Sequence, residues 1–306
     1  MIVIPKSLEQ LKFRLAVLKL ISTSFFYRYQ AGHELIGREF DSYGRKFAFR
    51  FLGSKDWGRF INLLCNPVSS TRYFEFPFCL NALNWNQVKT YLDISSPRLF
   101  LLYLLEKYPH LQGHFLNPDV SDLAETQHYF EQVKRPLKIQ FLTHDVTGLP
   151  YPDQSFDVIT SISVLEHIPK DGDSLAVREL WRVLKPHGKL ILTLPCAVNY
   201  EEEWREEDTY NLGYEAQNGK YFFQRFYDQR ALKERIFDAI SQTPQSLEVW
   251  GEKQAGTFQE YIEKWIKLGL LESIKDPYYV MQHYQSFPTM SSLVYMGICG
   301  LVFEKL

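Results

Sequence analysis

The sequence lacks the features of a disulfide-stabilised or metal-binding protein. Its four cysteines are scattered over 306 residues, at Cys65, Cys79, Cys196 and Cys299, and none shows a spacing typical of metal ligands. We therefore expect no metal site. Reduced, widely spaced cysteines are typical of packing residues in cytosolic proteins, so we expect a cytoplasmic protein without a signal peptide.

A long uncharged apolar run is also missing. The most apolar stretch near the N-terminus, Leu11–Phe26, is interrupted by Lys12, Arg14 and Lys19, whereas a spanning helix needs about 20 mostly uncharged residues. We expect no transmembrane segment, and the pattern predicts an amphipathic helix over residues 8–28. Two placements stay open: packing on the protein or on a second subunit of a homodimer, or lying on a membrane surface.

Charge of one sign is lacking as well. The chain has 34 Lys and Arg against 36 Asp and Glu, a net charge of −2, which gives no general attraction to nucleic acid. No nucleic-acid partner is expected. Aromatic residues are abundant instead, with 23 Phe and 19 Tyr. They supply apolar area for a core, and they equally suit a pocket for a bulky substrate.

Residues 138–195 carry the clearest structural pattern. Three short apolar runs, Ile139–Thr143, Phe156–Ser161 and Lys189–Leu194, alternate with a loop and a helical stretch at 173–184. Such alternation is typical of parallel strands in a βαβ sheet. Polar residues stand where these strands end, and ligands of open α/β sheets bind at the carboxyl ends of the strands. The segment therefore predicts a ligand site as well as a fold.

Five short motifs in this region occur in a fixed order. They are Asp145-Val146, Leu149-Pro150, Phe156-Asp157, Glu166-His167-Ile168 and Leu184-Lys185-Pro186-x-Gly188. Together they resemble the second half of a class I S-adenosylmethionine-dependent methyltransferase. The resemblance implies an α/β fold: a Rossmann-like, seven-stranded, mostly parallel sheet with an antiparallel last strand, helices on both faces and a helical N-terminal extension. It also implies S-adenosyl-L-methionine (SAM) as cofactor and S-adenosylhomocysteine (SAH) as product.

The resemblance divides the chain into two parts. Residues 1–85 are expected to form a helical and aromatic extension or lid, and residues 86–306 the methyltransferase domain. The remaining strands are expected at Val88–Ile94, His114–Leu116, Leu247–Gly251 and Gly297–Phe303. An insertion at about 197–227 is acidic first, then aromatic, with no clean period. A loop of this length is usually functional or disordered, and here it follows the fifth strand, beside the reaction site.

The turn after the first strand departs from the family pattern. Asp93 keeps the acidic position, but Ser95, Pro97 and Leu99 stand where the family often has glycines, with Ser96 between the first two. A serine adopts a positive φ only at a cost. Its hydroxyl can still bond a cofactor, and a proline can begin a helix. A rebuilt turn and a degenerate turn that no longer binds SAM therefore both stay open.

The second strand departs further. The family places an acid for the ribose hydroxyls at its end. In the family, a small polar residue and a proline usually follow this acid. If Asn117 and Pro118 are that pair here, Phe115 stands at the position of the acid. Asn117 or Asp119 would then contact the ribose. The alternative is a helix N-cap before residues 120–134, which Asp119 or Ser121 suits.

The third and fourth strands follow the pattern. Asp145 resembles the acid that accepts the adenine amino group, and the backbone of Val146 would read a ring nitrogen. Ser161, Ile162 and Ser163 match positions that pack against the adenosine and methionine moieties.

Two further pairs complete the predicted site. Arg72 and Tyr73 precede the first strand, where an N-terminal segment often closes over the cofactor, and Arg72 suits the cofactor carboxylate. His167, with Glu166 beside it, is a candidate base for an oxygen or nitrogen acceptor. A role of this pair in holding the turn is the alternative.

The leading functional hypothesis is O- or N-methylation of a small molecule or short peptide, in secondary metabolism. It depends on the missing basic stripe and on the aromatic insertion, which suits an apolar substrate. One alternative is a methyltransferase-like partner or scaffold that has lost SAM, and another is an RNA or protein methyltransferase. A nicotinamide dehydrogenase fits less well, because the first turn has no G-x-G-x-x-G.

Overall fold

The computed structural model describes residues 6–210 and 213–306, with side chains from residue 11 onward. The chain divides into two compact units. The first comprises Met1–Phe74 and Thr257–Tyr284, and the second comprises Glu75–Gly256 and Gln285–Leu306. The boundary between the two units lies within helix α4 (Arg72–Asn81), whereas we expected the N-terminal extension to end at residue 85. Residues 257–284 join the N-terminal residues in the first unit.

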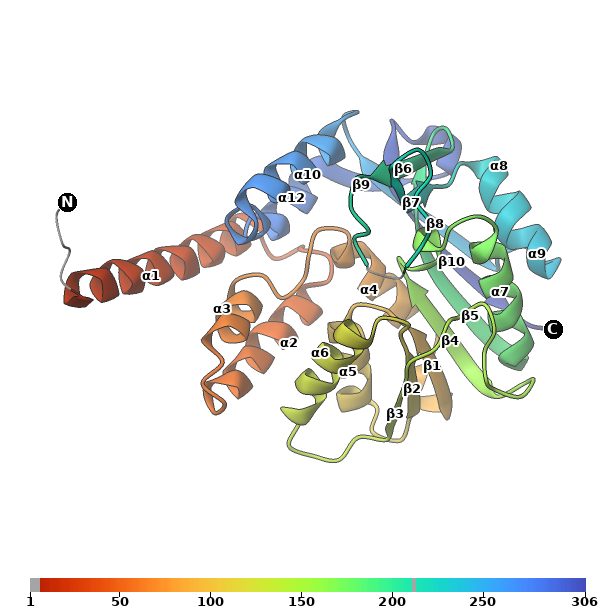
Figure 1. Ribbon diagram of the computed structural model, residues 1–306, viewed down its shortest axis with the longest axis horizontal. Helices are drawn as coiled ribbons and strands as arrows, with labels where there is room; N and C mark the ends of the chain where they lie inside the picture. The colour runs from red at the N-terminus through yellow and green to blue at the C-terminus, as the bar shows by residue number, and fades with distance from the viewer. Residues whose placement is uncertain (1–5, 211–212) are drawn as a thin grey trace. The chain divides into compact units, whose positions relative to one another are not determined.

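The first unit is helical. It contains α1 (Lys6–Ala31), α2 (Arg38–Ala48), η1 (Phe49–Leu52), α3 (Trp57–Cys65), α10 (Thr257–Leu268), α11 (Leu270–Ser273) and α12 (Asp276–His283). Helix α1 contacts α3 and α12, and it confirms the helix expected at residues 8–28 (Figure 1). Within the described residues, no helix is long and apolar enough to cross a membrane.

The second unit is built on an eight-stranded sheet with the order β3-β2-β1-β4-β5-β10-β8-β9. The strands are β1 (Thr90–Ile94), β2 (Gln112–Leu116), β3 (Ile139–Leu142), β4 (Phe156–Ile162), β5 (Leu184–Ala197), β8 (Ser246–Glu252), β9 (Tyr284–Phe287) and β10 (Met296–Glu304). The first five are mutually parallel, and β10 runs antiparallel to β5 and β8. The predicted Rossmann-like class is confirmed, with β9 as an additional edge strand.

Helices cover both faces of this sheet (Figure 1). On one face lie α4 and α5 (Arg98–Lys107), whose Phe76 and Phe100 rings lie 5.5 Å apart. Phe78 of α4 packs so closely on β10 that a Cβ on Gly300 would lie 2.6 Å from its ring. That contact explains a glycine in a central strand, where it would otherwise weaken the sheet.

The opposite face carries a continuous apolar core. Buried residues of α7 (Gly172–Val183) pack there against the inner residues of β1, β4, β5 and β10. The same core includes residues of α8 (Gln229–Leu232), which continues through a π-turn (Lys233–Phe237) into α9 (Asp238–Ile240). Helix α6 (Val120–Glu131) connects β2 with β3, and short 3-10 turns lie at Trp85–Gln87, Leu165–His167 and Met290–Ser292.

The insertion after β5 forms an antiparallel pair of strands, β6 (Glu201–Arg205) and β7 (Tyr221–Phe226). A bulge between Glu203 and Trp204 shifts the register, and every residue of β6 is at least partly exposed. A strand with no buried face has no reason to alternate apolar and polar residues. This explains why the sequence shows no period here.

Candidate cofactor and active site

The sheet has one topological switch point, between β1 and β4. The chain leaves β1 towards β2 and leaves β4 towards β5, so the connections diverge above the carboxyl ends of these two neighbours. Ligands of open α/β sheets bind in the crevice at such a point. Predicted cofactor residues meet here: Ser95 and Ser96 directly follow β1, Ser161 and Ile162 end β4, and Ser163 follows β4.

The two serines that follow these strands both have left-handed backbones. Ser95 has φ 48° and Ser163 has φ 50°, in a region that costs a non-glycine residue roughly 1–2 kcal/mol. The N–H and hydroxyl of Ser95 both donate to the Leu116 carbonyl, each at 2.9 Å. These two bonds tie the turn to the end of β2 and offset the strain. Ser95 thus adopts the backbone conformation for which a glycine would normally be used.

Asp93, the residue of β1 that lies two positions before Ser95, also stabilises this turn. Its carboxylate is fully buried and accepts from the Tyr91 hydroxyl at 2.7 Å and from the Ser96 N–H at 2.9 Å. Burial raises the pKa of Asp93 to about 6, and the bonds from Tyr91 and Ser96 oppose that rise. The Ser96 hydroxyl in turn accepts from the Ile162 N–H at 3.2 Å. The turn after β1 is therefore fastened to β4.

Helix α5 begins immediately after this turn. Pro97 occupies its N-cap position, and no side chain in the described chain caps it. The first N–H groups of a helix lack intrahelical partners and carry a partial positive charge. Beside the switch point, they suit an anionic group such as the carboxylate at the methionine end of SAM.

The end of β2 offers no carboxylate at the position where the family resemblance predicts one. Phe115 is fully buried, and its ring lies 6.1 Å from that of Phe141. Asn117 donates from its amide to Asp122 at 2.8 Å and accepts from the Asp119 N–H at 2.9 Å. Asp119 is the N-cap of α6, as the alternative interpretation predicted. Both polar residues thus serve the start of α6.

The end of β3 is more open. The Asp145 side chain is exposed and accepts from the N–H and the hydroxyl of Thr147, both at 2.7 Å. Val146 is buried beside it. Burial, and then the negative charge of Asp145, raise the pKa of Tyr214. Tyr214 belongs to the β6–β7 connection, so the charge of Asp145 acts on a residue of this connection.

Helix α4 contributes a buried carboxylate that sequence reasoning missed. Glu75 accepts from the Ser163 hydroxyl at 2.5 Å and from the Thr193 hydroxyl at 2.7 Å. It thereby joins the end of β4 to β5. The nearby Ser161 hydroxyl is fully buried and has no hydrogen-bond partner in the described part of the chain. A buried polar atom without a partner is uncommon, and it is consistent with a polar ligand in the crevice.

His167 lies under the β6–β7 hairpin. Its Nδ1 lies 2.7 Å from the Phe223 carbonyl and its Nε2 lies 3.2 Å from the Tyr210 hydroxyl. A carbonyl only accepts, so Nδ1 carries a proton, and when the ring is neutral Nε2 accepts from Tyr210. Glu166 lies 3.7 Å from Nε2. The sequence predicted His167 and Glu166 as site residues, but it did not predict that Phe223 and Tyr210 contact His167. The aromatic residues of the insertion were the only sequence feature that pointed to these contacts.

A buried charge cluster fixes the hairpin in place. Arg225 of β7 lies 2.7 Å from Asp173 of α7, and both side chains are almost completely buried. Arg235 and the Tyr227 hydroxyl also donate to Asp173, at distances of 2.7 to 2.9 Å. Two cations and a phenol compensate one buried carboxylate. Losing a member of such a cluster leaves an uncompensated buried charge.

Arg72 and Tyr73, the first residues of α4, belong to the first unit. Tyr73 is fully buried, and its hydroxyl donates to Asp41 of α2 at 3.0 Å. Burial, with the charge of Asp41, raises the pKa of Tyr73 well above its ordinary value. Tyr73 thus has a structural contact within its own unit, and cofactor contact by these two residues stays a prediction.

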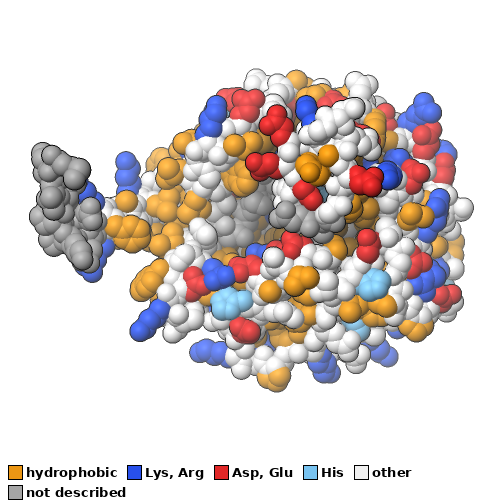
Figure 2. All heavy atoms as spheres, in the orientation of Figure 1, with side chains coloured by type: hydrophobic (Ala, Val, Ile, Leu, Met, Phe, Trp, Pro, Cys, Tyr) orange, Lys and Arg blue, Asp and Glu red, His pale blue; other side chains and the backbone are white. Residues whose placement is uncertain are grey.

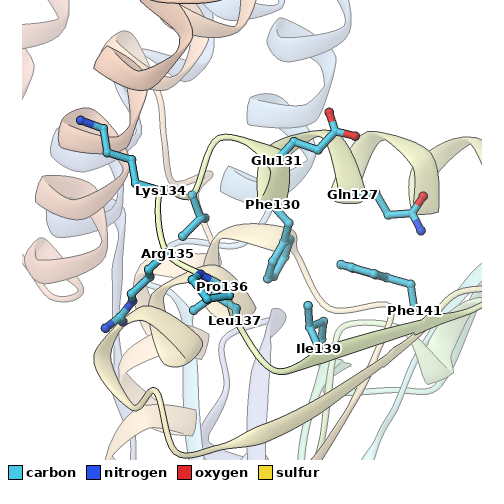
Figure 3. A pocket seen from close by; sticks show the side chains of 10 residues that line it. Gln127, Phe130, Glu131, Lys134, Arg135, Pro136, Leu137, Ile139 and Phe141 are labelled. Atoms are coloured by element: carbon cyan, nitrogen blue, oxygen red, sulfur yellow. The ribbon is translucent and has the colours of Figure 1, made fainter.

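A surface hollow of about 560 Å³ lies elsewhere in the second unit (Figure 3). Its walls come from the end of α6 and from the residues that lead into β3, including Phe130, Lys134, Arg135 and Phe141. It lies towards the amino end of β3, away from the carboxyl ends of the strands that carry the candidate site. We assign it no part in the site.

Comparison with known proteins agrees with this location. Residues 96–192 match the sequence model of a family described as a methyltransferase domain. The matched range begins in the turn after β1 and ends within β5, so it spans the switch point.

Two curated relatives are methyltransferases. Phosphoethanolamine N-methyltransferase of Plasmodium falciparum is 28% identical over 146 residues, 46% of this chain and 53% of the relative. Demethylmenaquinone methyltransferase of Deinococcus radiodurans is 36% identical over 95 residues, 30% of this chain and 37% of the relative. The chain thus spans about half the length of these relatives or less.

A solved SAM-dependent methyltransferase from Methanosarcina mazei aligns at 15% identity and a TM-score of 0.46, covering 75% of this chain and 97% of that one. The family assignment depends on the domain match and on the strand order. Together they confirm the resemblance of residues 96–192 and of the sheet around them to class I, Rossmann-like S-adenosylmethionine-dependent methyltransferases.

Proposed function

We propose that this protein transfers a methyl group from SAM to a small-molecule acceptor and releases SAH. The observation that carries the proposal is the turn at Ser95, which has a glycine-like backbone at the switch point of a methyltransferase domain. Two relatives act, by their names, on phosphoethanolamine and demethylmenaquinone. These acceptors are small molecules, and they support the same substrate class here.

The chain's residues fit SAM at two of its three parts. Exposed Asp145 and the Val146 backbone suit the adenine, and the start of α5 suits the methionine carboxylate. For the ribose, Asn117 is the one polar residue that we propose as a contact, because Phe115 stands at the position of the acid. When bound, SAM supplies a methyl group already activated on a sulfonium, so positioning provides much of the catalysis.

His167 is the proposed base for an oxygen or nitrogen acceptor. Its Nδ1–H is held by the Phe223 carbonyl, which leaves Nε2 to accept a proton. Tyr210, bonded to this Nε2, and the stacked Phe223 ring at 5.7 Å form an aromatic wall beside it. Such a wall favours an apolar or aromatic acceptor, either a small molecule or a short peptide.

The test is calorimetric titration of SAH into wild-type protein and into Asp145→Ala. Loss of a hydrogen bond between a carboxylate and the adenine amino group is expected to weaken binding roughly ten- to hundred-fold. Asp153→Ala is the matched control, because Asp153 is an exposed aspartate that pairs with Arg182 on the surface. Equal affinity in Asp145→Ala and wild type would contradict the assigned adenine end.

A second candidate is a methyltransferase-like scaffold that has lost SAM. The buried Phe115 in place of an acid favours it. The same titration separates the two proposals, because a scaffold gives neither heat nor thermal stabilisation with SAH or SAM. If SAH binds, radiolabelled SAM with a panel of amine, phenol and carboxylate acceptors identifies the acceptor class.

A further inference from the structure

Helix α1 carries an exposed apolar stripe that the proposed function does not use. Seven of its large apolar residues are between 45% and 82% exposed: Leu11, Phe13, Leu15, Leu18, Phe25, Phe26 and Tyr29. At 100° per residue, six of them lie within about 100° of the helix circumference, and Phe13 lies on the opposite side. The six therefore form one continuous face rather than scattered surface positions.

In the C-terminal half of α1, the other side of the helix packs within its own unit. The Ser24 hydroxyl donates to the Cys65 carbonyl at the end of α3, at 2.8 Å. The Tyr27 ring lies 5.9 Å from that of Tyr278 on α12, and Ala31 is buried. The helix thus already has an internal face, and the apolar stripe is a second one.

Basic residues border the stripe on both sides. Lys12 and Lys19 follow one edge and Arg14 follows the other, and all three are exposed. Residues 11–31 also contain Arg28, which pairs with Asp41 inside the unit, and they contain no acidic residue. Figure 2 shows hydrophobic and basic side chains side by side along this helix.

This charge pattern discriminates between two possible occupants. In a symmetric pairing of residues 11–31 of two copies, each basic border would meet another basic border, and these residues supply no acid to compensate it. An anionic lipid surface is compatible with both the apolar stripe and its basic borders. The apolar stripe enters the interface between headgroups and acyl chains, while the lysines and the arginine extend to the lipid phosphates.

We propose that α1 docks this protein on anionic membrane surfaces, lying in the interface rather than crossing the bilayer. The observations that carry this proposal are the exposed stripe from Leu11 to Tyr29 and its borders at Lys12, Arg14 and Lys19. It does not depend on methyl transfer, so it stands or falls separately from the proposed activity.

The experiment is flotation of the full chain with vesicles of phosphatidylcholine alone or mixed with phosphatidylglycerol. We expect binding to the mixed vesicles, weakening as salt screens the charges. Neutralisation of the borders in Lys12→Gln/Arg14→Gln/Lys19→Gln should lower the partition coefficient on the order of 100-fold, since each charge contributes roughly a five-fold factor near such a surface. Leu15→Ser/Leu18→Ser should lower it at least about ten-fold through lost apolar burial.

The matched control is Leu175→Ser on α7, a leucine that is 47% exposed in the other unit. It should bind vesicles like wild type, and circular dichroism with thermal melting checks that every variant folds. Failure of folded wild type to bind mixed vesicles would overturn the proposal. So would binding that the stripe and border variants leave unchanged, or a wild-type dimer that Leu15→Ser/Leu18→Ser dissociates while vesicle binding is absent.

Discussion

The two halves of the candidate cofactor site differ in how far their residues depart from the family pattern. At the ends of β3 and β4, Asp145, Val146 and Ser163 occupy positions that the family pattern anticipates. At the ends of β1 and β2, Ser95 stands where the family often has a glycine, and Phe115 stands at the position where an acid was predicted. The departures differ in kind, because Ser95 preserves a backbone shape whereas Phe115 removes a chemical group.

This difference shows that what a glycine-rich turn needs first is a particular backbone conformation, which another residue type can also adopt. Ser95 meets it through two hydrogen bonds to the Leu116 carbonyl. No rearrangement of the backbone replaces a missing carboxylate. The ribose is therefore the part of the cofactor for which this chain offers least, and each departure can be tested separately.

The largest effect is expected from restoring the missing acid. Phe115→Asp removes a fully buried ring and buries a carboxylate in its place. Removing such a ring costs about 3–5 kcal/mol, and an unpaired buried charge adds to that. Urea unfolding measures it. Phe115→Leu, which keeps an apolar side chain, should lose less, and a fully stable Phe115→Asp would contradict the burial of this side chain.

An intermediate effect concerns pH. Burial raises the pKa of Asp93 in the folded protein to about 6, above the value near 4 in the unfolded chain, so the folded protein binds this proton more tightly. The contribution of Asp93 to the free energy of unfolding is therefore complete below pH ~4. It is lost as pH rises through about 6, and the free energy of unfolding decreases by about 3 kcal/mol.

Unfolding followed between these pH values measures the Asp93 contribution. Asp93→Asn, which cannot ionise, should flatten the decrease over this window. An identical pH profile in the variant would assign the decrease to other groups.

The smallest effects are expected at Ser95. Ser95→Val places a β-branched residue at a positive φ, which costs about 1–3 kcal/mol, and it should weaken SAH binding by distorting the turn. Ser95→Gly relieves the strain but loses the hydroxyl bond to Leu116, so its stability should change by less than about 1 kcal/mol. Equal behaviour of the two variants would refute the backbone argument.

Much of the fold could be predicted from sequence because its signals are local. The strands and helix of residues 138–195 lie where their apolar runs and motifs placed them, and the departure at Phe115 was visible before any coordinates. Asp119 shows the limit of such reasoning, since ribose contact and helix capping suit the same residue. Only the hydrogen bonds to Ser121 and Asp122 distinguished them.

The rest depends on contacts between distant residues. His167 bonds Phe223 and Tyr210, which lie in a hairpin whose exposed, bulged strand carries no periodic signal. Glu75 reaches Thr193 across more than a hundred residues. Residues 257–284 join the N-terminal helices without any local pattern that marks the association.

The central claim is that the turn at Ser95 still holds SAM, and a crystal structure with SAH tests it most directly. The account predicts the adenine at Asp145 and Val146, the methionine carboxylate at the start of α5, and a positive φ at Ser95. Crystals that contain no SAH at saturating concentration, or SAH bound away from the β1–β4 switch point, would contradict it.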